Sequence, residues 1–165
     1  MGKQRAGDLI HLTQAEVDRL IAMEKHYQGN NPYDFPSGGK ELRIPLVSGD
    51  RRHEFDLDIN SKRFNIKKYT FGNRTQNTIV LVRVDLLEGG RHINPDNEEI
   101  EGPHIHRYRE GFGDKWAKPL PSEFGNPNNI FEVLQRFMDY CLIVTKPVFS
   151  RSLFGYHDIQ KAIPP

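Results

Sequence analysis

Residues 78–87 constrain the fold of this chain more than any other segment, because almost every position in the run is apolar. A strand that is buried on both faces shows such a run, so the segment is predicted to be the central strand of a sheet. Its two charged residues, Arg83 and Asp85, fall on the same face of a strand. They could pair with each other or orient a histidine on the neighbouring strand.

Further strands are predicted before and after this run. Residues 42–46 and 55–59 alternate apolar and polar side chains, which predicts a hairpin with one solvated face, and Pro45 places its first strand at an edge. A third strand is expected to run through Phe71 and to end in a turn at Gly72-Asn73. The segment 102–110 is expected to be the next strand and to pair with the central run.

Two helices carry clear start signals. Thr13 and Glu16 form a capping box, which predicts a helix over about residues 14–26, and Asn129 begins a helix of regular apolar spacing over residues 130–141. We therefore expect one α+β domain over residues 1–165, with a mainly antiparallel sheet of about five to six strands and both helices packed on it. Residues 1–11 are expected to be flexible, and the apolar tail 146–165 is expected to pack on the body or on a partner.

Composition excludes some classes of function. Lys and Arg total 23 against 22 Asp and Glu, so the net charge of +1 steers the whole molecule only weakly toward nucleic acid or membrane. The single cysteine, Cys141, cannot form an internal disulfide and is expected to be a buried thiol. We find no apolar run of membrane-spanning length and no secretory leader, and so expect a cytoplasmic protein without a membrane partner.

The segment around His104 and His106 is the strongest candidate site. In a strand these two side chains share one face with Tyr108, whereas Arg107 and Arg109 point to the other. One imidazole could take the proton of an RNA 2′-hydroxyl and the other could protonate the leaving oxygen, with Tyr108 and Arg107 at the phosphate. The alternative is a pair of half-exposed sheet histidines whose N–H groups are satisfied by neighbours.

The same pair could bind zinc, but a tetrahedral site needs at least a third protein ligand. His92, Asp96 and His157 are the candidates, and none has a recognised metal spacing to the pair. The sequence therefore favours a site with no metal and no cofactor, and a metal-binding enzyme remains the lesser alternative.

A basic and aromatic stretch at residues 61–74 is the second candidate site. Cations there could neutralise RNA phosphates while Tyr69 stacks a base. The residues expected to contact RNA are Lys62, Arg63, Lys67, Lys68, Tyr69, Arg109 and Lys115. The alternative is a solvated strand face, which is common protection for a sheet edge. The acidic loop at residues 96–101 could lie across this stretch or form a solvated turn.

From the central strand to the second helix, the order of motifs resembles the TumE family of bacterial toxin–antitoxin proteins. The matching segments are Arg83-Val84-Asp85, Gly89-Gly90, residues 102–106, residues 116–120 and residues 130–137. The resemblance implies that His104 and His106 are the functional positions and that the partners are RNA and an antitoxin protein. The whole chain is also similar to a family of small bacterial proteins for which the resemblance supplies no activity.

Two functions of different classes follow. The first is a toxin-like, RNA-directed protein, with a metal-independent endoribonuclease built on His104 and His106 as its activity. The alternative is a non-enzymatic inhibitor from a mobile genetic element, which would bind a target protein through the acidic loop and the apolar tail. The sequence leaves the oligomeric state open.

Overall fold

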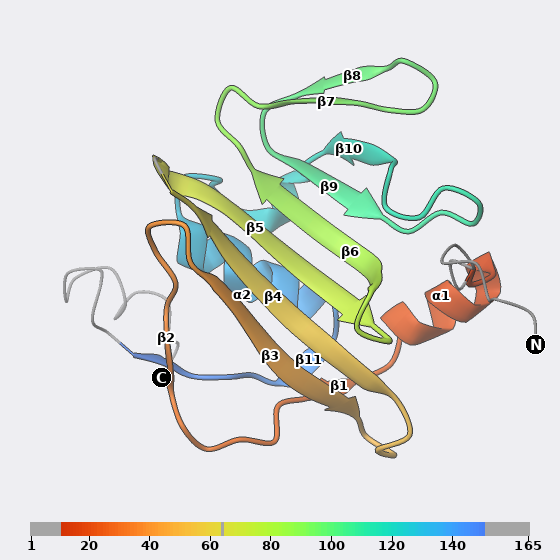
Figure 1. Ribbon diagram of the computed structural model, residues 1–165, viewed down its shortest axis with the longest axis vertical. Helices are drawn as coiled ribbons and strands as arrows, with labels where there is room; N and C mark the ends of the chain where they lie inside the picture. The colour runs from red at the N-terminus through yellow and green to blue at the C-terminus, as the bar shows by residue number, and fades with distance from the viewer. Residues whose placement is uncertain (1–10, 64, 151–165) are drawn as a thin grey trace, which may run out of the picture.

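A computed structural model describes residues 11–63 and 65–150, with the side chains of residues 65–67 excepted. The expectations for residues 1–10, and for the apolar tail beyond Ser150, lie outside the described residues. Within the described part, the chain forms one α+β domain built on a mixed sheet of eight strands (Figure 1). The predicted fold class is confirmed, although the sheet is larger than the five to six strands expected.

The main sheet consists, in spatial order, of β10 (Ala117–Pro119), β9 (His104–Arg107), β6 (Ile79–Leu86), β5 (Asn65–Thr75), β4 (Glu54–Lys62), β3 (Glu41–Ser48), β1 (Lys25–His26) and β11 (Ile143–Thr145). The strands beyond the expected five to six are short. The parallel pairing of β1 with β11 makes the sheet mixed. Two smaller ladders join β12 (Phe149–Ser150) to β2 (Tyr33–Asp34) and β7 (Arg91–Ile93) to β8 (Glu99–Glu101).

Strand β6 pairs with β5 on one side and with β9 on the other, as its apolar sequence predicts. Val84 of β6 and Ile105 of β9 lie opposite each other and are buried in the core. The predicted hairpin is also confirmed, because β3 and β4 pair in antiparallel fashion through Pro45 and Asp56. Strand β3 lies between β4 and β1, so it is not the edge strand that Pro45 predicts, but Pro45 itself precedes the residues that pair with β1.

Helix α1 (Gln14–Ile21) begins at the predicted capping box, in which Thr13 and Glu16 bond to each other's backbone N–H groups. The helix ends earlier than predicted, and Lys25–His26 forms β1 instead of a last helical turn. The reason is the buried Lys25 ammonium, which donates to the carbonyl oxygens of Ile21, Met23 and Cys141 and so holds the chain in a sharp turn.

Helix α2 (Ile130–Tyr140) begins at Asn129, whose side chain accepts a hydrogen bond from the Glu132 N–H. Its buried residues, such as Phe137, pack on one face of the sheet, behind the strands in Figure 1. A short 3₁₀ helix, η1 (Ser122–Phe124), precedes it. Among the helices of the described residues, none is long and apolar enough to span a membrane.

The expected turn at Gly72-Asn73 is wrong, because both residues lie inside β5. The chain turns instead at Gln76 and Asn77, which adopt φ angles of 51° and 61°. Gly72 pairs with Asp58 on β4, and a Cβ atom at Gly72 would lie 3.4 Å from the Asp58 carboxylate. Gly72 therefore lies within a strand, where a Cβ atom would make only an ordinary van der Waals contact with Asp58.

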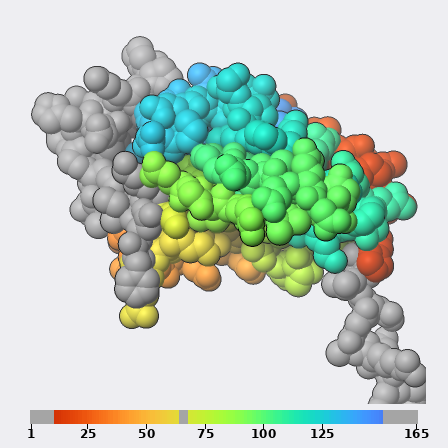
Figure 2. Space-filling model, turned by 90° about the horizontal axis from the view of Figure 1, so that it is seen from above, coloured from red at the N-terminus to blue at the C-terminus, as the bar shows by residue number. Residues whose placement is uncertain are grey.

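The sheet face opposite α2 carries polar side chains, and the β7–β8 hairpin lies at one end of it. Asn94 follows β7, and its side chain exchanges hydrogen bonds of 2.9 and 2.8 Å with the backbone of Ala117 in β10. In Figure 2 the hairpin forms one continuous surface with the segment that follows β9. The hairpin is thereby fixed beside the histidine strand.

Candidate metal centre

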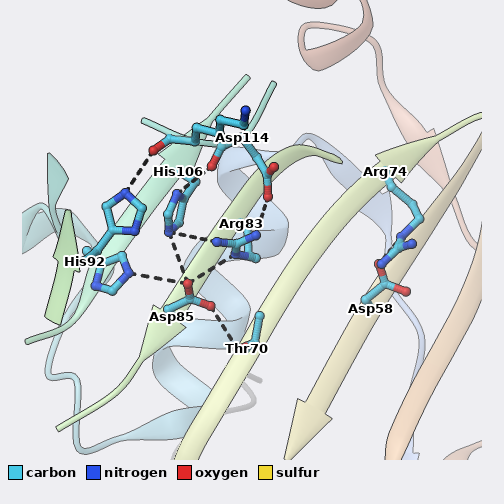
Figure 3. A network of polar contacts seen from close by, with 10 residues as sticks. Asp58, Thr70, Arg74, Arg83, Asp85, His92, His106 and Asp114 are labelled. Carbon is cyan, nitrogen blue, oxygen red and sulfur yellow. Dashed lines mark hydrogen bonds and ion pairs between the residues drawn. The ribbon is translucent and has the colours of Figure 1, made fainter. Parts of the chain in front are cut away.

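The polar face of β6 meets the polar face of β9. The strand register pairs Arg83 with His106 and Asp85 with His104. Asp85 Oδ2 lies 3.1 Å from Arg83 Nε, 3.1 Å from His106 Nε2 and 3.4 Å from His104 Nε2. Asp85 thus both pairs with Arg83 and contacts the histidines across the ladder, as the parity of the two strands predicts (Figure 3).

A third histidine, His92 of β7, completes the cluster. Its ring centroid lies 4.6 Å from that of His106 and 5.5 Å from that of His104. One ring nitrogen from each of the three side chains lies within 4.8 Å of the others. The docking of the hairpin therefore brings His92 next to His104 and His106, although His92 lies outside their strand.

Backbone carbonyl groups fix the orientation of each ring. His104 Nδ1 lies 2.7 Å from the Gly102 oxygen, His106 Nδ1 lies 2.8 Å from the Asp114 oxygen, and His92 Nε2 lies 2.9 Å from the Lys115 oxygen. A carbonyl oxygen only accepts hydrogen bonds, so each of these nitrogens carries a proton. In a neutral ring the other nitrogen then carries a lone pair. That nitrogen is Nδ1 in His92 and Nε2 in His104 and His106.

Arg83 and Thr70 complete the polar network. Arg83 Nη2 lies 3.0 Å from His106 Nε2, and Arg83 Nη1 forms an ion pair with the carboxylate of Asp114. Thr70 of β5 donates a hydrogen bond of 2.9 Å to Asp85 Oδ1. Both oxygens of the buried carboxylate are therefore occupied, as a buried charge requires.

Burial and hydrogen bonding shift the pKa values of Asp85 and His104 in opposite directions. Burial would raise the pKa of Asp85, but the contacts with His104, His106 and Arg83 hold the pKa of this carboxyl well below its usual range. Burial would lower the pKa of His104, but its contacts with Asp85 and the Gly102 carbonyl raise that pKa above 6.5. The carboxylate is consequently ionised at neutral pH.

The histidine pair is brought together as predicted, but Tyr108 and Arg107 make their contacts elsewhere. The Tyr108 hydroxyl lies 3.2 Å from both the backbone nitrogen and the backbone oxygen of Leu12. Strand β9 ends at Arg107, so the alternation of side chains between the two faces of the strand does not extend to Tyr108. Arg107 bonds to Asp18 and to the Tyr140 hydroxyl. The expected face of His104, His106 and Tyr108 therefore does not form.

The predicted RNA-binding residues differ in exposure. Tyr69 is only 1% exposed, and its hydroxyl donates to the Pro36 carbonyl, so the expectation that its ring faces solvent to stack a base is wrong. Its ring lies on the core side of β5, beside that of Phe71. Lys62, Arg63, Arg109 and Lys115 are exposed, Lys68 is half-buried, and the side chain of Lys67 lies outside the described residues. The Arg109 guanidinium stacks 4.1 Å from the Trp116 ring centroid.

Two contributors to the site did not stand out in the sequence. His92 has no recognised metal spacing to the histidine pair, and Asp114 belongs to no motif in the sequence. The turn residues 94–97 between two short extended segments are the signal that could have predicted the hairpin. His157 lies outside the described residues. Cys141 is buried, as predicted, and burial raises the pKa of its thiol to about 12.

Comparison with known proteins identifies the family but not an activity. Neither the curated proteins nor the solved structures gave a significant match. The resemblance to TumE-like toxins is not confirmed, whereas the expectation of a family without an assigned activity is. Residues 12–143, which include every member of the histidine cluster, match one family across most of the chain. The chain belongs to the family of unknown function DUF6978.

Proposed function

We propose that this protein binds one divalent transition metal, preferably zinc, through His92, His104, His106 and Asp85. The observation that carries the proposal is that three imidazoles converge while each donates its other N–H to a backbone carbonyl. Metal-binding histidines usually have such an outer partner, which fixes the tautomer and turns the lone pair toward the ion.

The distances support a tetrahedral site after a small contraction. Zinc binds nitrogen and oxygen at about 2.0–2.1 Å, which places two ligands of a tetrahedron about 3.3 Å apart. Asp85 Oδ2 already lies 3.1 and 3.4 Å from the nitrogens of His106 and His104. One nitrogen of each of the three rings lies within 4.8 Å of the others, so these nitrogens would have to approach one another by at most about 1.5 Å to reach this spacing.

The donor set favours zinc and indicates a structural or regulatory centre. Imidazole suits zinc, copper and nickel, and three nitrogens with one carboxylate oxygen match the tetrahedral preference of zinc. Four protein ligands leave no coordination position open for a substrate. The ligands come from β6, β7 and β9, so the bound ion would join the β7–β8 hairpin to the main sheet.

The competing interpretation is a buried polar network that needs no metal. In that case Arg83 pairs with the carboxylates of both Asp85 and Asp114, and the rings of His104 and His106 contact Asp85. Such a network does not require an unprotonated ring nitrogen on His92. His92 is therefore the residue at which the two interpretations predict different results.

The test is the metal content and zinc affinity of the full chain. Purified protein is stripped with a chelator, dialysed and titrated with zinc in a calorimeter, and cobalt is substituted to record the visible spectrum of a tetrahedral site. We expect one ion per chain. Replacing His92→Ala should weaken zinc binding at least tenfold, because it removes one of four ligands.

The matched control is His53→Ala, because His53 is half-buried like His92 but lies outside the cluster. This variant should bind zinc as the wild-type protein does. Zinc at 100 times the wild-type Kd should also stabilise the wild-type fold by about 2.7 kcal/mol and that of His92→Ala by at most about 1.4 kcal/mol. Equal zinc affinity in the wild type and in His92→Ala would exclude this site.

The RNA-directed and inhibitor functions remain predictions. The side chains of His104 and His106 are 3% and 0% exposed, so an RNA phosphodiester could reach them only after the structure opened. The exposed cations Lys62 and Arg63 are compatible with an RNA contact. Growth arrest on expression, lost in a Lys62→Glu and Arg63→Glu double variant that still folds, would support the RNA-directed function. Capture of a target protein without any RNA binding would favour the inhibitor.

A further inference from the structure

We infer that Arg83 is a built-in competitor for the metal, so that zinc binds only when the Arg83 guanidinium leaves His106. This inference rests on the proposed metal site and concerns what sets its affinity. Arg83 lies opposite His106 in the ladder between β6 and β9, and its guanidinium extends into the cluster (Figure 3).

The competition is for one lone pair. His106 Nδ1 donates to the Asp114 carbonyl, so the neutral ring offers a single in-plane lone pair at Nε2. In this neutral form Arg83 Nη2, 3.0 Å from that nitrogen, donates into the lone pair, whereas a ring protonated at both nitrogens would donate from Nε2 to Asp85 Oδ2, 3.1 Å away. A metal bound to His106 needs the same lone pair, so the hydrogen bond and the metal bond exclude each other.

The competition is also for one carboxylate oxygen. Arg83 Nε lies 3.1 Å from Asp85 Oδ2, the oxygen that faces His104 and His106. The guanidinium is always charged, and a divalent ion at this place would be repelled by it. Arg83 therefore takes both the lone pair and the negative charge that zinc would use.

The structure leaves Arg83 a place to move. Its side chain is 29% exposed, and Asp114, which pairs with Nη1, is 31% exposed, so this pair lies at the open rim of the cluster. A guanidinium that swings away from His106 can therefore keep its ion pair with Asp114 at this rim.

Coupling of this kind acts in both directions. Zinc would push the guanidinium to the rim, and any anion that holds the guanidinium at the rim would strengthen zinc binding by the same factor. Arg83 consequently sets the zinc concentration at which the site fills.

The test compares zinc affinity in three full-length proteins by competition with a chromophoric chelator at one pH. Arg83→Met removes every donor, so it should bind zinc at least tenfold more tightly than the wild type. Arg74→Met is the matched control, because Arg74 is also ion-paired on this sheet face and its partner Asp58 keeps Arg43. The control should bind zinc within threefold of the wild type.

A second measurement covers the case in which Arg83→Met does not fold. The arginine Nε–Hε signals of the wild-type protein are followed by NMR during a zinc titration, with the Arg83 signal assigned through Arg83→Lys. We expect the Arg83 signal to shift in step with zinc occupancy while that of Arg74 stays in place.

The outcomes separate the two proposals. If the wild type binds zinc but Arg83→Met binds it no more tightly, or if the Arg83 signal does not move on zinc binding, Arg83 is not a competitor and the metal site stands. Equal tightening in Arg83→Met and Arg74→Met would mean a general charge effect and would also overturn the inference. If neither the wild type nor Arg83→Met binds zinc, the metal site itself is wrong.

Discussion

Lys25 makes a specific prediction about how stability depends on pH. The residue has no solvent exposure, and its ammonium group donates to three backbone carbonyl oxygens, of Ile21, Met23 and Cys141. Burial lowers the pKa of Lys25 from 10.5 to about 8. Because burial disfavours the charged form, folding carries a cost whenever Lys25 is protonated in both the folded and the unfolded state.

The sign and size of the effect follow from this pKa. Between pH 8 and 10.5 the unfolded state binds more protons at Lys25 than the folded state, so the free energy of unfolding rises with pH in this window. At about 1.4 kcal/mol for each pH unit, the full effect is about 3 kcal/mol. Below pH 8 the cost is constant, and above 10.5 it is gone.

The perturbation is Lys25→Met, which keeps most of the side-chain volume and removes the titrating group. The free energy of unfolding of both proteins is measured by urea denaturation at pH 7 and pH 10.5. The wild type should gain about 3 kcal/mol relative to Lys25→Met over this interval. Taking the difference cancels other groups that titrate here, such as Tyr69, whose pKa burial raises. A constant difference would refute the assigned pKa of Lys25.

Three further substitutions test the packing around the site. Asn94→Ala removes both bonds to the Ala117 backbone, so it should cost about 2–4 kcal/mol in urea denaturation and weaken zinc binding at His92. Tyr108→Phe should lower the free energy of unfolding by about 1–2 kcal/mol, because it loses the bonds to Leu12, and zinc affinity should stay unchanged. A loss of zinc binding would show that Tyr108 belongs to the site. Phe137→Ala in α2 should cost about 3–5 kcal/mol, because Phe137 is fully buried.

The sequence predicted those parts of the fold that depend on local periodicity. The apolar run of β6, the β3–β4 hairpin and the two capped helix starts are all features of neighbouring residues in the chain. The parity of β6 and β9 also placed Asp85 with a histidine, because alternation fixes which side chains share a face once two strands are adjacent.

The remaining features depend on contacts between distant segments. Alternation alone does not say which face of β5 is buried, and Tyr69 faces the core because α2 covers that side, with Phe137 against Phe71. His92 joins the cluster because the hairpin docks on the segment of β10, through Asn94 on Ala117 and through His92 itself on the Lys115 carbonyl. A spacing rule between ligands could not detect this contact.

The position of the cluster explains why a buried carboxylate is tolerated on the sheet face that lies opposite α2. Asp85 is 8% exposed, and its histidine and arginine partners are each held by a second group: a backbone carbonyl for each of His104 and His106, and Asp114 for Arg83. Removing one partner from such a network leaves a buried charge unpaired, so the network is stable only as a whole. The structure has the arrangement with Arg83 on His106, and in the proposed metal-bound form an ion would take the place of the guanidinium there. The β7–β8 hairpin carries His92, so under this proposal metal binding would add a further attachment of the hairpin to the sheet.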